Sequence, residues 1–520
     1  MRVRRSFFNY TTSLATTFTT LLVSFIATPY ILRWLGPERY GVYRLILDWL
    51  GYLALVDIGL SDSLIPLFAQ SMHTGNETRV RSVLITGIRA FLKLTPIKAV
   101  FGIILIWLIP TLVASKVQQE VAIRAACTLG VISTLLSFLH PFRPLVESRQ
   151  MGYKINQLLA FQMILATGLS LFFVGKGLGT FGQFVAISLS EIPYYMALIY
   201  SVSTSIPDFW KHLFRSFKRS SGEGWAWSKI WTLNRANFVG NMCGRIGLSS
   251  DSILIGLLLN TKSVTSFFMT QRLATIFQSQ LLHIGTATWA GLSELYIQGK
   301  KEIFEERLIE LSQIIVVMGF VLLGPVIAYN IHFVSLWVGL DHYAGGWVAM
   351  LSALNGILLG LLALWSWMFS SLGLVKHLLP YTIVATVVNF ATSILFTYLL
   401  GPAGPLLGTF TASVAVSFWA VPKLLQKHFS VRARRLYLAV FMPFAKLLPV
   451  IALLCLFARS HVPWGWVGLI GEMALSGILL SILSWYLVLT PHEKTLWKSR
   501  FQKNLLDFKE SLKNQSEVGT

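Results

Sequence analysis

Fourteen stretches of the sequence are apolar over the roughly 20 residues that an α-helix needs to cross a membrane. Charged residues make up only 12% of the 520 residues and hydrophobic residues 54%, whereas about 25% of a typical soluble domain is charged. The sequence therefore predicts an all-α polytopic membrane protein with about 14 transmembrane helices. The predicted spans lie near 8–32, 40–66, 83–113, 121–141, 155–174, 180–203, 230–258, 264–294, 308–330, 347–370, 377–400, 403–422, 437–458 and 464–489.

The connecting loops differ in charge from one side to the other. With a cytoplasmic N-terminus, the cytoplasmic segments hold 28 of the 43 Lys and Arg residues, the outer loops hold 6, and the spans hold the other 9. Basic residues gather on the cytoplasmic side of membrane proteins, so this distribution predicts that both termini are cytoplasmic. It also accounts for the net charge of +21, and no nucleic-acid partner is expected.

A weak internal repeat divides the chain into halves. A shift of 226 residues lays Gly175–Ala186 over Gly401–Ala412 and places six spans in each half. Because six is even, the halves have the same orientation, as in transporters whose substrate path lies between parallel repeats. An amphipathic linker and tail are expected to contact membrane lipids. The predicted domains are two pseudo-symmetric six-helix bundles, 1–204 and 230–430, the cytoplasmic linker, 205–229, transmembrane helices 13 and 14, 431–490, and the cytoplasmic tail, 491–520.

Nine basic residues lie inside the predicted spans. Each costs roughly 2.5–3.5 kcal/mol at a lipid-facing helix centre, so most must reach the membrane edge, pair with an acid or face a wet interior. Acids in the spans are fewer, which leaves some bases without an internal partner. A surplus of cations in a wet cavity favours an anionic substrate, such as a phosphate or an acidic sugar. The bases expected to bind it are Arg245, Arg272, Arg44, Lys93 and Lys98.

Three acids in the spans, Asp48, Asp251 and Glu191, have two alternative roles. Each can pair with a base, as the spacing of Arg44 and Asp48 on one helical face allows. Each can instead carry a coupling ion, H⁺ or Na⁺. No metal-ligand spacing or phosphate-binding loop occurs in the sequence, so no metal and no other cofactor is expected.

The second predicted span carries four charges, Arg44, Asp48, Asp57 and Asp62. They are tolerable in a membrane helix if one face of that helix borders an aqueous cavity. Gly59 lies between the last two acids, toward the cytoplasmic end, and is expected to let the helix bend there.

Four motifs resemble those of bacterial polysaccharide flippases: Leu35–Tyr43, Tyr52–Leu60, Ser250–Gly256 and the Gly401–Gly404 turn. These flippases belong to the multidrug/oligosaccharidyl-lipid/polysaccharide exporter superfamily, and the resemblance covers nearly the whole chain. It implies a V-shaped pair of bundles in the inner membrane that opens alternately to each side. It also implies an undecaprenyl-pyrophosphate-linked oligosaccharide, such as an O-antigen unit, as cargo for surface polysaccharide biosynthesis, with a polysaccharide polymerase and glycosyltransferases as partners.

Other interpretations remain. A cation-coupled multidrug antiporter or a peptidoglycan-precursor flippase would belong to the same superfamily, although span 1 lacks the acid that multidrug extruders usually place there. A membrane-embedded polymerase or ligase tends to carry a sizeable external loop. The longest external loop here, 331–346, is short and offers only the neighbouring Asp341 and His342. The protein is therefore expected not to be an enzyme and to have no catalytic residue.

Overall fold

The structure, a computed structural model, describes residues 2–57, 59–73, 77–114, 120–204, 223–491, 494–495 and 499. Every regular element of this part of the chain is a helix, which confirms the all-α prediction. The chain folds into two compact units, each drawn from several parts of the sequence. The predicted boundaries of the bundles, linker and tail stay a prediction, and most of the linker and the tail lies outside the described residues.

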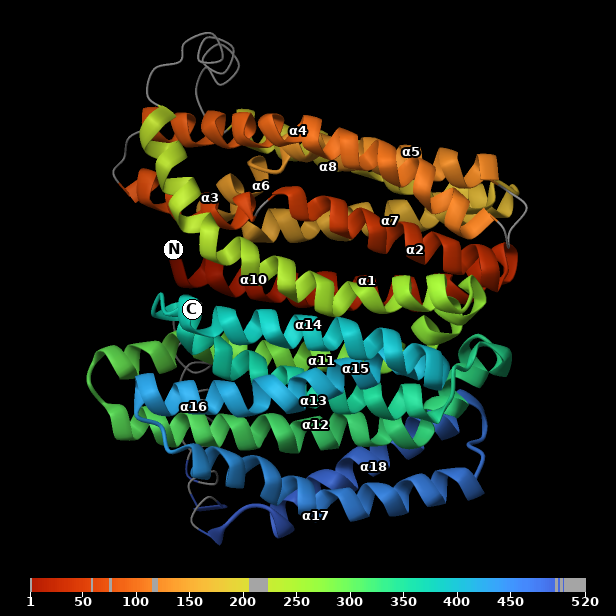
Figure 1. Ribbon diagram of the computed structural model, residues 1–520, viewed down its shortest axis with the longest axis vertical. Coiled ribbons are helices and arrows are strands. Elements are labelled where there is room, and N and C mark those ends of the chain that lie inside the picture. The colour runs from red at the N-terminus through yellow and green to blue at the C-terminus, as the bar shows by residue number, and fades with distance from the viewer. Residues whose placement is uncertain are drawn as a thin grey trace, which may run out of the picture. The chain divides into compact units, whose positions relative to one another are not determined.

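Unit 1 comprises Met1–Thr270, Trp337–Val348 and Gly373–Ser417. Its main helices are α1 (Arg2–Leu35), α2 (Pro37–Leu53), α3 (Leu60–His73), α4 (Glu77–Ala114), α5 (Glu120–Leu135), α6 (Phe142–Ser148), α7 (Gly152–Gly175), α8 (Gly179–Ser203), α10 (Glu223–Leu258), the first turns of α11 (Thr261–Ile297), α14 (Val375–Leu400) and α15 (Gly404–Ala412). Within this unit α1 packs along α7, α5 lies between α4 and α8, and α14 packs on α15 and α10 (Figure 1).

Unit 2 comprises Gln271–Leu336, Ala349–Leu372 and Phe418–Thr520. It holds the rest of α11, most of α12 (Lys301–Trp337) and α13 (Gly346–Ser371), and α16 (Phe418–Phe429), α17 (Ala433–Ser460) and α18 (Gly465–Leu487). The fully buried Trp365 of α13 donates a hydrogen bond of 2.9 Å to the Ser312 hydroxyl of α12. This bond satisfies the buried indole N–H and links the two helices.

Each of the fourteen predicted spans coincides with a helix or with a helix that is interrupted. Ten segments of the described chain are long and apolar enough to cross a membrane, and the segment Val375–Phe429 joins two of the predicted spans. The helices α2, α10 and α11 are not among the ten. These three carry Arg44, Arg245 and Arg272, whereas the other two candidate binding residues, Lys93 and Lys98, lie on α4, which is among the ten.

The second predicted span is broken, as expected from its sequence. Helix α2 ends at Leu53, a 3-10 turn covers Ala54–Asp57, and α3 begins at Leu60. Gly59 has φ of 65°, a left-handed conformation that glycine adopts without steric cost. The break places the Asp57 side chain at the junction of two helices instead of on the side of a continuous one.

The packing of α14 on α15 depends on small residues. A Cβ atom on Gly408 would overlap Ser393, and one on Gly404 would overlap the backbone at Thr397. Beside this contact, the buried Asn389 donates to the Gly247 carbonyl of α10 at 3.3 Å and accepts from the Ser393 hydroxyl at 2.8 Å. The amide therefore links α14 to α10.

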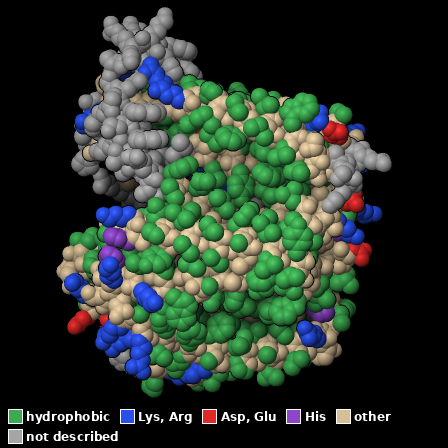
Figure 2. Space-filling model, in the orientation of Figure 1, with side chains coloured by type: hydrophobic (Ala, Val, Ile, Leu, Met, Phe, Trp, Pro, Cys, Tyr) green, Lys and Arg blue, Asp and Glu red, His purple; other side chains and the backbone are tan. Residues whose placement is uncertain are grey.

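Side chains on the surface follow the membrane pattern. On the face shown in Figure 2, hydrophobic side chains cover the middle of the helices, and charged side chains gather toward the helix ends. Lipid requires an apolar belt of this kind. The protein is a multi-pass membrane protein.

Candidate functional site

Helices α2 and α10 lie against each other in unit 1 and run antiparallel. A Cβ atom on Gly256 would lie 2.7 Å from Leu45, and one on Gly41 would overlap the carbonyl oxygen of Thr261, just after α10. The two glycines therefore allow the backbones to approach closely. Polar and charged side chains lie along this contact; Asp251 is buried, and Arg44 and Asp48 are half-buried.

The first charged group in this contact is the predicted pair on α2. Arg44 Nη2 lies 3.9 Å from Asp48 Oδ1, and the guanidinium stands 4.0 Å above the ring of Phe268, a cation–π contact. Asp48 also accepts a hydrogen bond from Ser252 of α10 and lies within electrostatic range of Arg245. Both bases thus act on the same carboxylate.

The second group surrounds Asp251 of α10. This residue is only 8% exposed, and its Oδ1 atom has no hydrogen-bond partner. The neighbouring charged group is the Asp48 carboxylate. Tyr52 of α2 interacts with both acids, and its hydroxyl is hydrogen-bonded to Ser250.

A cavity of about 350 Å³ opens at the break after α2. Arg245 is exposed and packs over Gly51, where a Cβ atom would lie 3.7 Å from the guanidinium carbon. The cavity therefore presents a cation, a carboxylate, a hydroxyl and an aromatic ring to one space. Its lining includes Gly51, Asp57, Gly59, Ser61, Phe238 and Arg245.

Behind this cavity wall lies a buried ion pair. Lys98 of α4 is fully buried, and its Nζ lies 2.5 Å from Asp57 Oδ1 and donates to the Ser137 hydroxyl at 2.8 Å. His140 Nδ1 lies 3.8 Å from Asp57 Oδ2. The structure therefore places Lys98 behind the lining of the cavity, where it holds the carboxylate that the cavity exposes.

Two other predicted site residues lie elsewhere in unit 1, and a third belongs to unit 2. Lys93 is exposed on α4, and Glu191 of α8 accepts a hydrogen bond from Ser133 of α5. Arg272 is half-buried on α11 and belongs to unit 2. The structure thus brings together Arg44, Asp48, Asp251 and Arg245, and it adds to them Tyr52, Asp57 and Phe238, which the sequence did not single out as binding residues.

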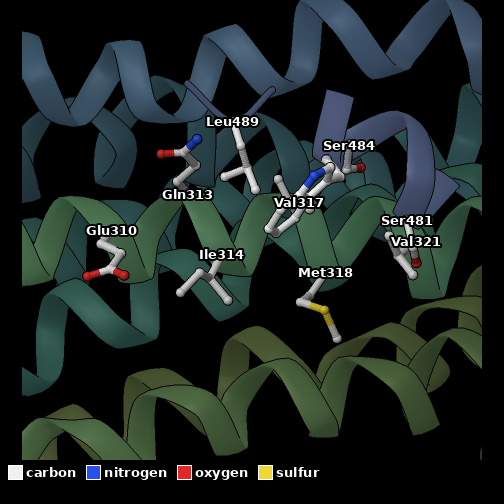
Figure 3. A pocket seen from close by; sticks show the side chains of 10 residues that line it. Glu310, Gln313, Ile314, Val317, Met318, Val321, Ser481, Ser484 and Leu489 are labelled. Atoms are coloured by element: carbon white, nitrogen blue, oxygen red, sulfur yellow. The ribbon is translucent and has the colours of Figure 1, made fainter. Parts of the chain in front are cut away.

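A second cavity, of about 270 Å³, lies in unit 2 between α12 and the end of α18. Figure 3 shows Val317 and Met318 of α12 on the same space as Ser481 of α18, with Glu310 toward one end. Its lining is mostly apolar, which suits a hydrocarbon chain better than a polar head group. In the part of the chain that the structure describes, no cluster of three or more His, Cys, Asp or Glu is placed to hold a metal ion.

Among the comparisons with known proteins, the one with solved structures gives matches. No family model matches the sequence, and no curated protein matches it significantly. The solved structure of the lipid II flippase MurJ in an inward closed conformation aligns over 95% of this chain and 99% of its own, with a TM-score of 0.67 and 12% identity. An inward-facing multidrug resistance MATE family transporter of the MOP superfamily aligns over 79% of this chain and 95% of its own, with a TM-score of 0.63 and 16% identity.

A third structure, a MOP superfamily transporter from Pyrococcus furiosus, aligns over 83% of this chain and 96% of its own, with a TM-score of 0.56 and 13% identity. At such low identity, these likenesses establish a shared fold. The chain therefore has the fold of the MOP superfamily transporters, along nearly its whole length in the case of MurJ.

Proposed function

We propose that the protein is a flippase that moves a lipid-linked oligosaccharide across the inner membrane, with its head group in the cavity at the break between α2 and α3. One observation carries this proposal. Inside a membrane protein with a transporter fold, a cavity of about 350 Å³ is lined by a guanidinium, a carboxylate, a hydroxyl and an aromatic ring. Ionisable groups that line a cavity among the spanning helices of a membrane protein mark a substrate path.

Each lining group suits part of a saccharide–phosphate head group. The Arg245 fork can donate two hydrogen bonds to a phosphate or to the carboxylate of an acidic sugar. Asp57 and Ser61 can bond sugar hydroxyls, and Phe238 offers an apolar surface to a sugar ring. Lys98 fixes the Asp57 carboxylate from behind, so this acceptor is oriented before the substrate arrives.

The polyprenyl tail would remain in the lipid while the head group crosses. The motif resemblance supports undecaprenyl pyrophosphate as the carrier and a surface polysaccharide, such as O-antigen, as the product. A polysaccharide polymerase and glycosyltransferases would then act after and before this step. Transport by alternating access is consistent with the fold shared with MurJ and MATE transporters.

Deletion of the gene tests this function. Lipid-linked saccharides should accumulate on the inner leaflet, out of reach of glycan-modifying enzymes added to sealed spheroplasts, and surface polymer should be lost. Arg245→Ala should reproduce the defect, whereas Arg459→Ala, which removes an exposed base at the end of α17, should complement the deletion. Unpolymerised units on the outer leaflet would instead indicate a polymerase or ligase, and unchanged saccharide pools would indicate another cargo, such as a drug.

A further inference from the structure

The loop that joins α16 to α17 in unit 2 is flanked by bases and by no acid. Neither helix contains an Asp or a Glu. Figure 2 shows Lys and Arg side chains gathered near this end of unit 2, which the sequence predicts to be cytoplasmic. Bases are common in cytoplasmic loops, so their partners decide whether they do more than set the topology. The exposed bases here are Lys423, Lys427, Arg432, Arg434 and Arg435.

The nearest acid is already used by one of these bases. Glu305 of α12 accepts from Arg432 Nε at 2.9 Å, from Nη2 at 2.9 Å and from the backbone N–H at 2.9 Å. Arg435 lies within electrostatic range of the same carboxylate. Among the described residues, no acid forms an ion pair with Lys423, Lys427 or Arg434. These three charges are therefore available to an anion from outside the chain.

A contact between two aromatic rings brings these charges onto one surface. The rings of Trp419 of α16 and Tyr437 of α17 lie 5.2 Å apart. Lys423 follows Trp419 by four residues, and Arg434 precedes Tyr437 by three, so each base lies about one turn from its ring on the same helical face. Both lie on the loop side of the ring contact. Lys423 and Arg434 therefore occupy the same level of the α16–α17 pair, and Lys427 lies one turn further out.

The surface changes from cationic to aromatic to apolar along the helices. Trp419 is 44% exposed, and beyond the rings α17 exposes Leu438 and Phe441. Trp and Tyr gather at the level of the lipid head groups, so the bases lie where phosphates lie. An anionic head group with a hydrocarbon tail matches this order of side chains. A soluble anion would use only the cationic part of the surface.

We propose that this surface binds an anionic phospholipid of the cytoplasmic leaflet, with its phosphate between Lys423 and Arg434 and its acyl chains along Leu438 and Phe441. Arg434 offers a planar fork to the phosphate and Lys423 a point charge. Basic sites between transmembrane helices on the cytoplasmic side bind such head groups. Because the bases come from two helices, the bound lipid links the end of α16 to the start of α17. The site belongs to unit 2 and is independent of the proposed function, whose cavity belongs to unit 1.

Lipid binding is measurable without any transport assay. The purified full-length protein in detergent is titrated with phosphatidylglycerol or with phosphatidylcholine of the same acyl chains, and bound lipids are counted by native mass spectrometry. We expect phosphatidylglycerol to bind more tightly. Lys423→Gln and Arg434→Gln should each weaken its binding about 5-fold, the contribution of one base near an anionic lipid. The double variant should lose the preference for phosphatidylglycerol.

Lys300→Gln/Lys301→Gln is the matched control, because it removes two exposed bases from the turn between α11 and α12 of the same unit. It should keep the full preference. All four substituted side chains are exposed, so we expect both double variants to fold. Equal affinity of the wild type for the two lipids would overturn the proposal, as would an equal loss in the control. Displacement of the lipid by an equal concentration of inorganic phosphate would assign the site to a soluble anion and overturn the lipid assignment.

Discussion

Lys98 Nζ lies 2.5 Å from Asp57 Oδ1 at the break between α2 and α3, and no part of the lysine side chain is exposed. The sequence places these charges in two different apolar spans, where each alone would be costly. The contact resolves that cost, because each charge is the partner of the other. It also leaves Asp57 on the wall of the cavity, where it can accept hydrogen bonds from a substrate.

Removal of one partner of this pair should destabilise the protein. Lys98→Met leaves the Asp57 carboxylate buried without a cation, a change that typically costs about 3–5 kcal/mol. The double variant Lys98→Met/Asp57→Asn should recover part of the loss, because both charges are then absent. Thermal unfolding of the purified variants measures this, and a Lys98→Met protein as stable as the wild type would contradict the pairing.

Close helix contact predicts opposite effects of alanine at two glycines. Gly41→Ala places a methyl group onto the carbonyl oxygen of Thr261, so we expect a loss of roughly 1–3 kcal/mol from overpacking. Gly240→Ala in α10 meets no atom within 4 Å and should stabilise its helix by up to about 1 kcal/mol. If both variants change Tm equally, the contact between α2 and α10 is not as close as described.

The hydrogen bonds of the Asn389 amide should contribute more to stability than the volume of this side chain. Asn389→Leu leaves the Gly247 carbonyl and the Ser393 hydroxyl without this partner, and each lost buried hydrogen bond costs about 1–3 kcal/mol. Thr386→Val is the control, since the hydrogen bond that the Thr386 hydroxyl donates is to the Thr382 carbonyl of its own helix. A Tm for Asn389→Leu as high as that of the control would show that the amide does not hold α14 to α10.

The transport rate should depend on whether position 245 carries a guanidinium or an ammonium group. Arg245→Lys keeps the charge but loses the planar fork, so we expect it to flip substrate roughly 10-fold more slowly, in line with one charge-assisted hydrogen bond. Arg245→Ala should be slower still. Initial rates at equal protein content measure this order, and a lysine variant as fast as the wild type would mean that charge alone is recognised.

The features that could be predicted from the sequence are those that depend on residues close together along the chain. The apolar spans, the break at Gly59 and the Arg44–Asp48 pair all follow from spacing along one helix. The ion pair of Lys98 with Asp57 and the electrostatic interaction of Tyr52 with Asp251 join residues far apart in the chain. These contacts depend on which faces of the helices pack together. In a span that is apolar all round, the hydrophobic pattern does not show which face packs against another helix.

Reconstitution tests the central claim most directly. The purified chain in liposomes is given a polyprenyl-pyrophosphate-linked saccharide in the inner leaflet, and its arrival outside is followed with a membrane-impermeant glycosidase. The account predicts rapid exposure of the saccharide with the wild-type protein, and exposure close to that of protein-free liposomes with Arg245→Ala. Equal rates with wild type, Arg245→Ala and empty liposomes would contradict it.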